Sequence, residues 1–227
     1  MKPVALWGDS IGKGVVFDET RRRYVILKEN CMTMLRTQLG IELENHSVMG
    51  CTAEKALERF NDDTLIPGGV AVIEFGGNDS DMPWADISHA PGGNYAPNST
   101  VERFAQALVN LISRIRAGRM TPILVTPLPV VSKRYFDWVT RNLDAQAVLT
   151  WLGDVDHIYR WQERYAAAVR DVSRETQTQL LDLRDAFLNV GSLDRYFCLD
   201  GIHPNAIGHK LMFDFVLNRF IENSIVC

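Results

Sequence analysis

The chain has 227 residues, of which 46% are hydrophobic and 23% charged, a composition typical of one soluble globular domain with a sizeable core. Its net charge of -4 argues against a nucleic-acid partner, because phosphate binding needs clustered Lys and Arg. No apolar run reaches the roughly 18 to 20 residues of a membrane span, so no membrane partner is expected. The N-terminus lacks the layout of a signal peptide, which predicts a cytoplasmic protein; the oligomeric state stays open.

Short apolar runs have the composition of strands that are buried on both faces of a parallel sheet. The clearest cover residues 3–7, 70–75 and 122–126, and weaker candidates lie at 43–48 and 179–183. Strands of this kind alternate with helices in α/β proteins, so the segments between them are expected to be helical.

Two amphipathic segments between these runs predict helices. Apolar residues recur every four positions over 27–39, before a glycine stop at Gly40. In the second segment Ser99 and Glu102 have the spacing of a capping box, and an apolar stripe then runs to Gly118.

A last helix is expected to begin at Pro204 or Asn205 and to run to about Asn218. Alternating strands and helices favour right-handed crossovers and a three-layer α/β/α domain around a parallel sheet. Ligands of such sheets bind beyond the carboxyl ends of the strands. Chemistry is therefore expected in the residues that directly follow each apolar run.

The first run is followed directly by Gly8-Asp9-Ser10-Ile11-Gly12, a turn of small residues that would hold a serine hydroxyl at the mouth of the sheet. Ser10 is thus a candidate nucleophile. The pentapeptide also fits G-x-S-x-G, but in α/β-hydrolases that motif follows several strands rather than the first. Taken alone, a loop serine that caps the next helix is the commoner explanation.

A candidate base lies near the other end, in Asp200-Gly201-Ile202-His203-Pro204. A serine hydroxyl is a poor nucleophile until a base takes its proton, and that base needs a carboxylate to fix its tautomer. His203 and Asp200 supply these two roles, although a capping aspartate beside a surface histidine is an equal alternative for the peptide in isolation.

Candidate donors for an oxyanion follow two other predicted strands. Asn78 stands in Gly76-Gly77-Asn78-Asp79, where two glycines permit close approach of a substrate to the backbone. The N–H groups of Gly50 and Ser10 are further candidates, because acyl transfer places negative charge on a carbonyl oxygen. For Gly50 alone, a plain turn explains the sequence as well.

In this order and spacing, these four segments resemble the sequence blocks of the GDSL/SGNH hydrolase family. They are GDS at 8–10, SVMG ending at Gly50, GGND at 76–79 and DGIHP at 200–204, so the resemblance spans nearly the whole chain. Isoleucine stands at position 11 where the family name has leucine, a near-isosteric departure.

The resemblance implies a flavodoxin-like sheet of about five parallel strands within a single domain over residues 1–227. It implies an oxyanion hole formed by Ser10, Gly50 and Asn78, and a catalytic triad that Asp200 and His203 complete with Ser10. It also implies that the reaction uses no metal and no organic cofactor.

Other polar residues beside the motifs have no required step in acyl transfer. We interpret Asp9 and Asp79 as acceptors that orient the loops, and we assign no role to Asp81. The remaining histidines are interpreted as ordinary surface or partly buried residues: His46, His89, His157 and His209.

Aromatic residues are dense in a segment at about 128–165, which we interpret as an insertion. Any one of them is explained by packing of extra helices on the body. Our hypothesis is that part of this segment walls a substrate cleft together with loops 13–23 and 82–98. Tyr135 and Trp138 are its candidate substrate-binding residues, since aromatic faces suit a sugar ring or a short acyl chain.

The sequence thus predicts a serine esterase that acts on a small-molecule ester through an acyl-enzyme, with a short acyl group such as acetyl on a carbohydrate or similar alcohol favoured. Two alternatives remain. A non-catalytic binding module would keep only the fold. A metal-dependent phosphoesterase would use as ligands Asp9, Asn78, Asp79, Asp200 and His203.

Overall fold

The computed structural model describes residues 2–222. Its main sheet has five strands in the order β4-β1-β5-β6-β7, and every neighbouring pair is parallel. The strands are β1 (Val4–Gly8), β4 (Leu43–Asn45), β5 (Val70–Glu74), β6 (Thr121–Val125) and β7 (Gln179–Leu181). This confirms the predicted parallel sheet. With the first strand second from the edge, the order is that of flavodoxin-like folds.

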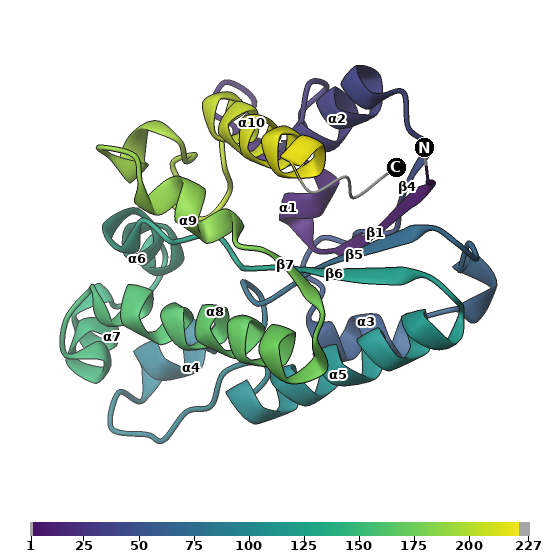
Figure 1. The fold of residues 1–227 in the computed structure, drawn as a ribbon. Coiled ribbons are helices and arrows are strands. Elements are labelled where there is room, and N and C mark those ends of the chain that lie inside the picture. Colours follow the sequence, from purple (N-terminus) through teal and green to yellow (C-terminus); the bar gives the residue numbers. More distant parts are fainter. Residues whose placement is uncertain (1, 223–227) are drawn as a thin grey trace.

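Alternate residues of the central strands face two helical layers. Ala5, Ala71 and Leu124 contact one layer, which contains α3 (Ala53–Arg59), α5 (Val101–Ala117) and α8 (His157–Thr176). Val4 and Ile123 contact the other, which contains α2 (Cys31–Leu39), α9 (Leu183–Leu188) and α10 (Ala206–Glu222). Figure 1 shows α3 and α5 on one side of the sheet and α2 and α10 on the other, so both faces are covered as the apolar runs require.

Capping side chains decide where the helices begin. The α2 helix begins at Cys31, later than predicted, because the Asn30 side chain accepts the N–H of Thr33 (3.1 Å). Gly40 ends it with a left-handed φ of 61°, as predicted from the glycine.

The predicted capping box of α5 is wrong. Thr100 caps this helix by accepting the N–H of Arg103, whereas the Ser99 hydroxyl donates to Glu54 of α3 (2.8 Å). The Ser99 hydroxyl is therefore used in a contact with the neighbouring helix α3 instead of in a cap of α5. The last helix runs beyond the predicted end at about Asn218, to Glu222.

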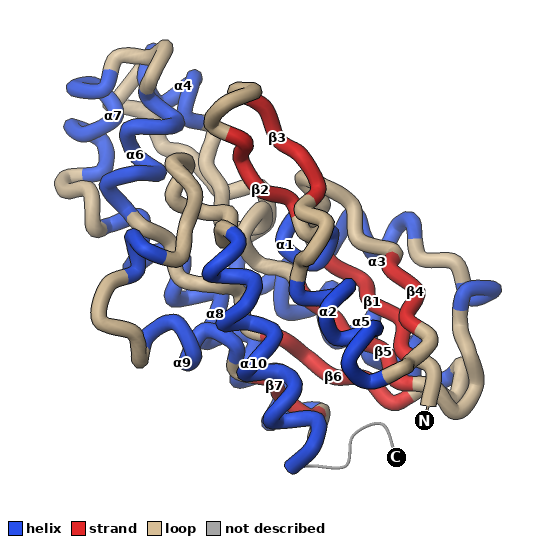
Figure 2. The backbone as a smooth tube through the Cα atoms, turned by 90° about the horizontal axis from the view of Figure 1, so that it is seen from above, coloured by secondary structure: helices blue, strands red, loops and turns tan. Residues whose placement is uncertain are grey.

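The predicted loop 13–23 contains part of an antiparallel hairpin, β2 (Val15–Asp18) and β3 (Arg23–Ile26). It follows the short helix α1 (Ser10–Lys13) and lies outside the main sheet (Figure 2). The aromatic segment forms α6 (Ser132–Thr140), α7 (Ala145–Leu152) and the first half of α8.

A third apolar cluster joins α6 and α7 to α4 (Trp84–His89). It includes Ile87, Phe136 and Val148, and it builds one side of the region beyond the carboxyl ends of the strands. Within residues 2–222, no helix combines the length and apolarity needed to cross a membrane.

The α5 stripe gives a stability prediction. Phe104 is completely buried between the sheet and Tyr165 of α8, so Phe104→Ala should lower the free energy of unfolding by about 3–5 kcal/mol. Urea denaturation measures this loss. Gln106→Ala, an exposed change on the same helix, is the control, and equal small losses in both variants would contradict the packing described.

Candidate active site

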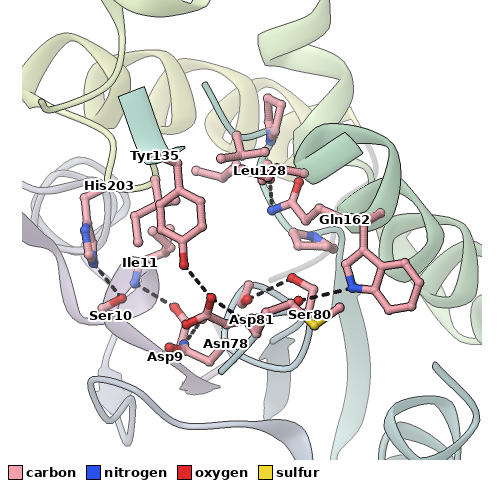
Figure 3. A pocket seen from close by; sticks show the side chains of 18 of the residues that line it. Asp9, Ser10, Ile11, Asn78, Ser80, Asp81, Leu128, Tyr135, Gln162 and His203 are labelled. Carbon is pink, nitrogen blue, oxygen red and sulfur yellow. Dashed lines mark hydrogen bonds between the residues drawn. The ribbon is translucent and has the colours of Figure 1, made fainter. Parts of the chain in front are cut away.

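The four motif segments meet at the carboxyl end of the sheet. In the β1–β5 pair Gly8 lies opposite Glu74, which brings the turns after the two strands side by side. A cavity of about 240 Å³ opens there, lined among others by Ser10, Gly50 and His203. Figure 3 shows the cavity from close by, with Asp9 and Ser10 of the first turn and Asn78 of the second among its labelled side chains.

Ser10, His203 and Asp200 form one hydrogen-bonded chain. The Ser10 Oγ lies 2.9 Å from His203 Nε2, and His203 Nδ1 lies 2.7 Å from Asp200 Oδ2. A carboxylate accepts only, so the ring hydrogen is placed at Nδ1, and Nε2 is left to accept from the hydroxyl. All three side chains are buried.

Asp200 is built to remain ionised. Burial opposes its ionisation, but the hydrogen bond and positive charge of His203, with the N–H groups of His203 and Ile202, hold the pKa of Asp200 below its usual range. A charged Asp200 fixes the orientation and the tautomer of the imidazole.

Three hydrogen-bond donors belong to residues that line the cavity: the N–H groups of Ser10 and Gly50 and the side-chain amide of Asn78. Gly50 has a left-handed φ of 74°, which glycine adopts without strain. Within residues 2–222 neither its N–H nor that of Ser10 has a hydrogen-bond acceptor. Asn78 Nδ2 donates one hydrogen to Asp9 (2.8 Å), which leaves its second for a ligand. The structure thus brings the three predicted oxyanion residues to one cavity.

Asp9 ties the two turns together. Its Oδ1 accepts the N–H of Ile11 and so caps α1, while its Oδ2 accepts from Asn78 (Figure 3). Both distances are 2.8 Å. This geometry agrees with our interpretation of Asp9 as a loop-orienting acceptor.

Glu74, the last residue of β5, is a site residue that the sequence analysis did not identify. It is buried, and its Oε2 accepts the N–H groups of Asp9 and Gly12, each at 3.3 Å. Burial and the neighbouring Asp9 raise the pKa of Glu74 well above its usual range. The sequence feature that could have identified Glu74 is that it is the one carboxyl in an otherwise apolar strand, where an unpaired charge is energetically unfavourable.

The sequence of residues 6–211 matches the model of the GDSL-like lipase/acylhydrolase family. The chain belongs to that family. Membership of a lipase and acylhydrolase family makes the chain a hydrolase. No curated protein sequence matches it.

Solved structures share the fold. A lipase/acylhydrolase from Enterococcus faecalis is 21% identical with a TM-score of 0.70, covering 98% of this chain and 97% of that one. The psychrotrophic esterase EstA from Pseudoalteromonas sp. is 16% identical, with a TM-score of 0.65 and 98% of both chains covered. A mutant acetyl-xylooligosaccharide esterase from Geobacillus is 18% identical, with a TM-score of 0.65, covering 96% of this chain and 93% of that one.

The walls of this GDSL-family cavity differ from the prediction at Trp138 and at the loop 13–23, none of whose residues lines the cavity. Tyr135 lines the cavity, but Trp138 does not. Trp138 instead packs on Phe17 of the hairpin (ring centroids 4.7 Å apart) and on Tyr24 (6.3 Å). Tyr24 itself lines the cavity, with its ring 5.0 Å from that of His203, so this hairpin residue is a wall residue that the sequence analysis did not identify.

One of the other histidines, His209, differs from its interpretation as an ordinary surface or partly buried residue, whereas His157 is partly buried, as interpreted. His209 is completely buried, and this burial lowers its pKa to about 4. His157 lines the cavity, stacked parallel to Trp161. Among residues 2–222, no group of three or more His, Cys, Asp or Glu side chains is arranged to hold a metal ion.

Asp79 gives a pH-dependent prediction. Its Oδ1 accepts the N–H of Ala53 (2.9 Å), and burial raises its pKa from 3.8 to about 7. Between these two values the folded chain binds a proton that the unfolded chain has released, so this group lowers stability as pH rises. Asp79→Asn removes the titration and keeps the acceptor. The variant's stability relative to wild type should therefore rise from pH 4 to pH 7, by about 1.4 kcal/mol per unit of pKa difference.

Urea denaturation at pH 4, 5.5 and 7 measures this change. Asp63→Asn is the matched control, because Asp63 is exposed and distant in sequence from the motifs. A difference between Asp79→Asn and wild type that stays constant over this range would contradict the buried, proton-binding Asp79.

Proposed function

We propose that this hydrolase is a serine esterase that cleaves carboxylic esters through an acyl-enzyme on Ser10. The observation that carries the proposal is the continuous chain of hydrogen bonds from Asp200 through His203 to Ser10. That order supplies the three roles which hydroxyl nucleophiles need: an attacking oxygen, a base within reach, and a carboxylate that orients the base.

Acylation begins when the Ser10 oxygen attacks the ester carbonyl and His203 Nε2 takes the hydroxyl proton. Asp200 stabilises the imidazolium that forms. The tetrahedral intermediate collapses with cleavage of the bond to the alcohol oxygen, and His203 returns the proton to the departing alcohol. Water then repeats these steps on the acyl-enzyme and releases the carboxylic acid.

The negative charge of each intermediate is stabilised by the Ser10 and Gly50 N–H groups and by Asn78 Nδ2. Such preorganised donors contribute roughly 2.7–4 kcal/mol each to transition-state stabilisation. Asp9 holds Asn78 through its other amide hydrogen, so this donor does not have to be ordered at the moment of reaction.

The favoured substrate carries a short acyl group such as acetyl on a carbohydrate or similar alcohol. Support comes from the modest cavity and its aromatic walls, which include Tyr24, Trp84 and Trp161. One structural relative is an acetyl-xylooligosaccharide esterase. Another, EstA, was solved inhibited by monoethylphosphonate, and phosphonates of this kind are suitable reagents for testing Ser10.

The alternative chemistries of the sequence analysis make different predictions. A metal-dependent phosphoesterase would lose its activity to a chelator and would not depend on a serine hydroxyl. A binding module on the same fold would have no turnover.

Initial-rate hydrolysis of p-nitrophenyl acetate, butyrate and octanoate tests the proposal. Wild-type turnover should be insensitive to a chelator, fastest on the short acyl chains, and lower by at least about 10³-fold in Ser10→Ala. Ser113→Ala is the matched control, a hydroxyl on the exposed side of α5. Activity that survives Ser10→Ala would place the nucleophile elsewhere, and inhibition by a chelator would favour a metal enzyme.

A further inference from the structure

Asp81 is fixed in the cavity wall one turn beyond Asn78. Its N–H donates to the Asn78 carbonyl (3.3 Å), and its own carbonyl accepts the N–H of Asn98 (2.9 Å). The side chain is half-buried and lines the same cavity as Ser10 (Figure 3). Asp81 is thus held rigidly near the oxyanion donors, with part of its carboxylate facing the cavity.

The two oxygens of this carboxylate are in different situations. Oδ1 accepts three hydrogen bonds, from the hydroxyl of Tyr135 (2.5 Å), Nε1 of Trp84 (2.7 Å) and the N–H of Met82 (2.9 Å). Figure 3 shows the Tyr135 hydroxyl directed at Asp81. Within residues 2–222, Oδ2 has no hydrogen-bond partner, yet it is not one of the fully enclosed polar atoms.

Two neighbouring polar side chains of the wall, Gln162 and Trp161, are already paired within the chain. Gln162 donates to the Leu128 carbonyl and accepts from Arg184, while Trp161 Nε1 donates to the Ser80 carbonyl. Oδ2 of Asp81 therefore stands out as an acceptor that remains available in a largely apolar wall. An ester that buried it without a donor would leave a desolvated carboxylate oxygen, which is unfavourable.

We propose that Asp81 determines specificity by accepting, through Oδ2, a hydrogen bond from a free hydroxyl group on the substrate, so that partially acetylated sugars or polyols are preferred over fully substituted esters. This rests on the proposed esterase function. The three dipoles on Oδ1 direct their positive ends at the carboxylate and offset its charge. A neutral hydroxyl therefore suits the site better than an ammonium group.

Asp81→Asn isolates the free oxygen. The asparagine Oδ1 can keep the three bonds from Tyr135, Trp84 and Met82, while an NH₂ group replaces Oδ2 and turns an acceptor into a donor. The substrates are a monoacetate of methyl xylopyranoside with its other hydroxyls free, and the same monoacetate with those hydroxyls O-methylated.

Wild type should hydrolyse the free-hydroxyl ester with the higher kcat/KM. In Asp81→Asn the ratio of kcat/KM between the two esters should fall at least about tenfold, mainly through a higher KM for the free-hydroxyl ester. Asp86→Asn, which removes an exposed carboxylate on α4, should keep the wild-type ratio. Thermal unfolding of each variant checks that the fold is retained.

An unchanged ratio in Asp81→Asn, or an equal loss on both esters, would overturn the proposal and leave Asp81 as a residue that only holds Tyr135 and Trp84. A wild-type preference for an amino-alcohol acetate over the free-hydroxyl sugar ester would also overturn it.

Failure of the esterase function itself is recognised separately, by turnover that survives Ser10→Ala or is absent from wild type. In that case calorimetry with methyl xylopyranoside replaces kinetics. Equal affinities of wild type and Asp81→Asn would then overturn the role of Asp81.

Discussion

The site depends on the bond between Asp9 and Asn78, which joins the turn after β1 to the turn after β5. The same carboxylate caps α1 at Ile11, so one side chain sets both the start of the helix that carries Ser10 and the direction of the Asn78 amide. The parallel register makes this possible, because Gly8 and Glu74 end their strands side by side. The proposed nucleophile and the proposed oxyanion donor Asn78 are consequently fixed relative to each other before a substrate binds.

The pKa values of the carboxyl groups around the cavity are shifted in different directions by their surroundings. Burial raises the pKa values of Asp9, Glu74, Asp79 and Asp81. The pKa of Asp200, in contrast to those four, is lowered, because His203 and two backbone N–H groups compensate for its burial. A negative charge is thus favoured beside the imidazole, where the proposed mechanism needs one, and is disfavoured on the carboxyls near Ser10, the proposed nucleophile.

The sheet could be predicted from the sequence because its strands are buried on both faces and read as apolar runs. The four motif segments also identified the residues that meet at its carboxyl end. The hairpin was not predicted, because its short strands combine apolar and charged residues without a clear alternation. Trp138 was placed wrongly because the hairpin was not predicted. Tyr135 and Trp138 lie three residues apart on α6, and Trp138 packs on the hairpin instead of lining the cavity. Glu74 was missed because residues 70–75 were interpreted only as a buried strand, and its one carboxyl was therefore given no role.

The central claim is that Ser10 is a nucleophile activated by His203, and covalent labelling tests it most directly. The chain is treated with a fluorophosphonate, and the modified peptide is located by mass spectrometry after proteolysis. We predict one adduct, on Ser10, formed rapidly in wild type and at least about 10³-fold more slowly in His203→Gln. An adduct on another residue, or labelling of Ser10 at an equal rate without His203, would contradict the account.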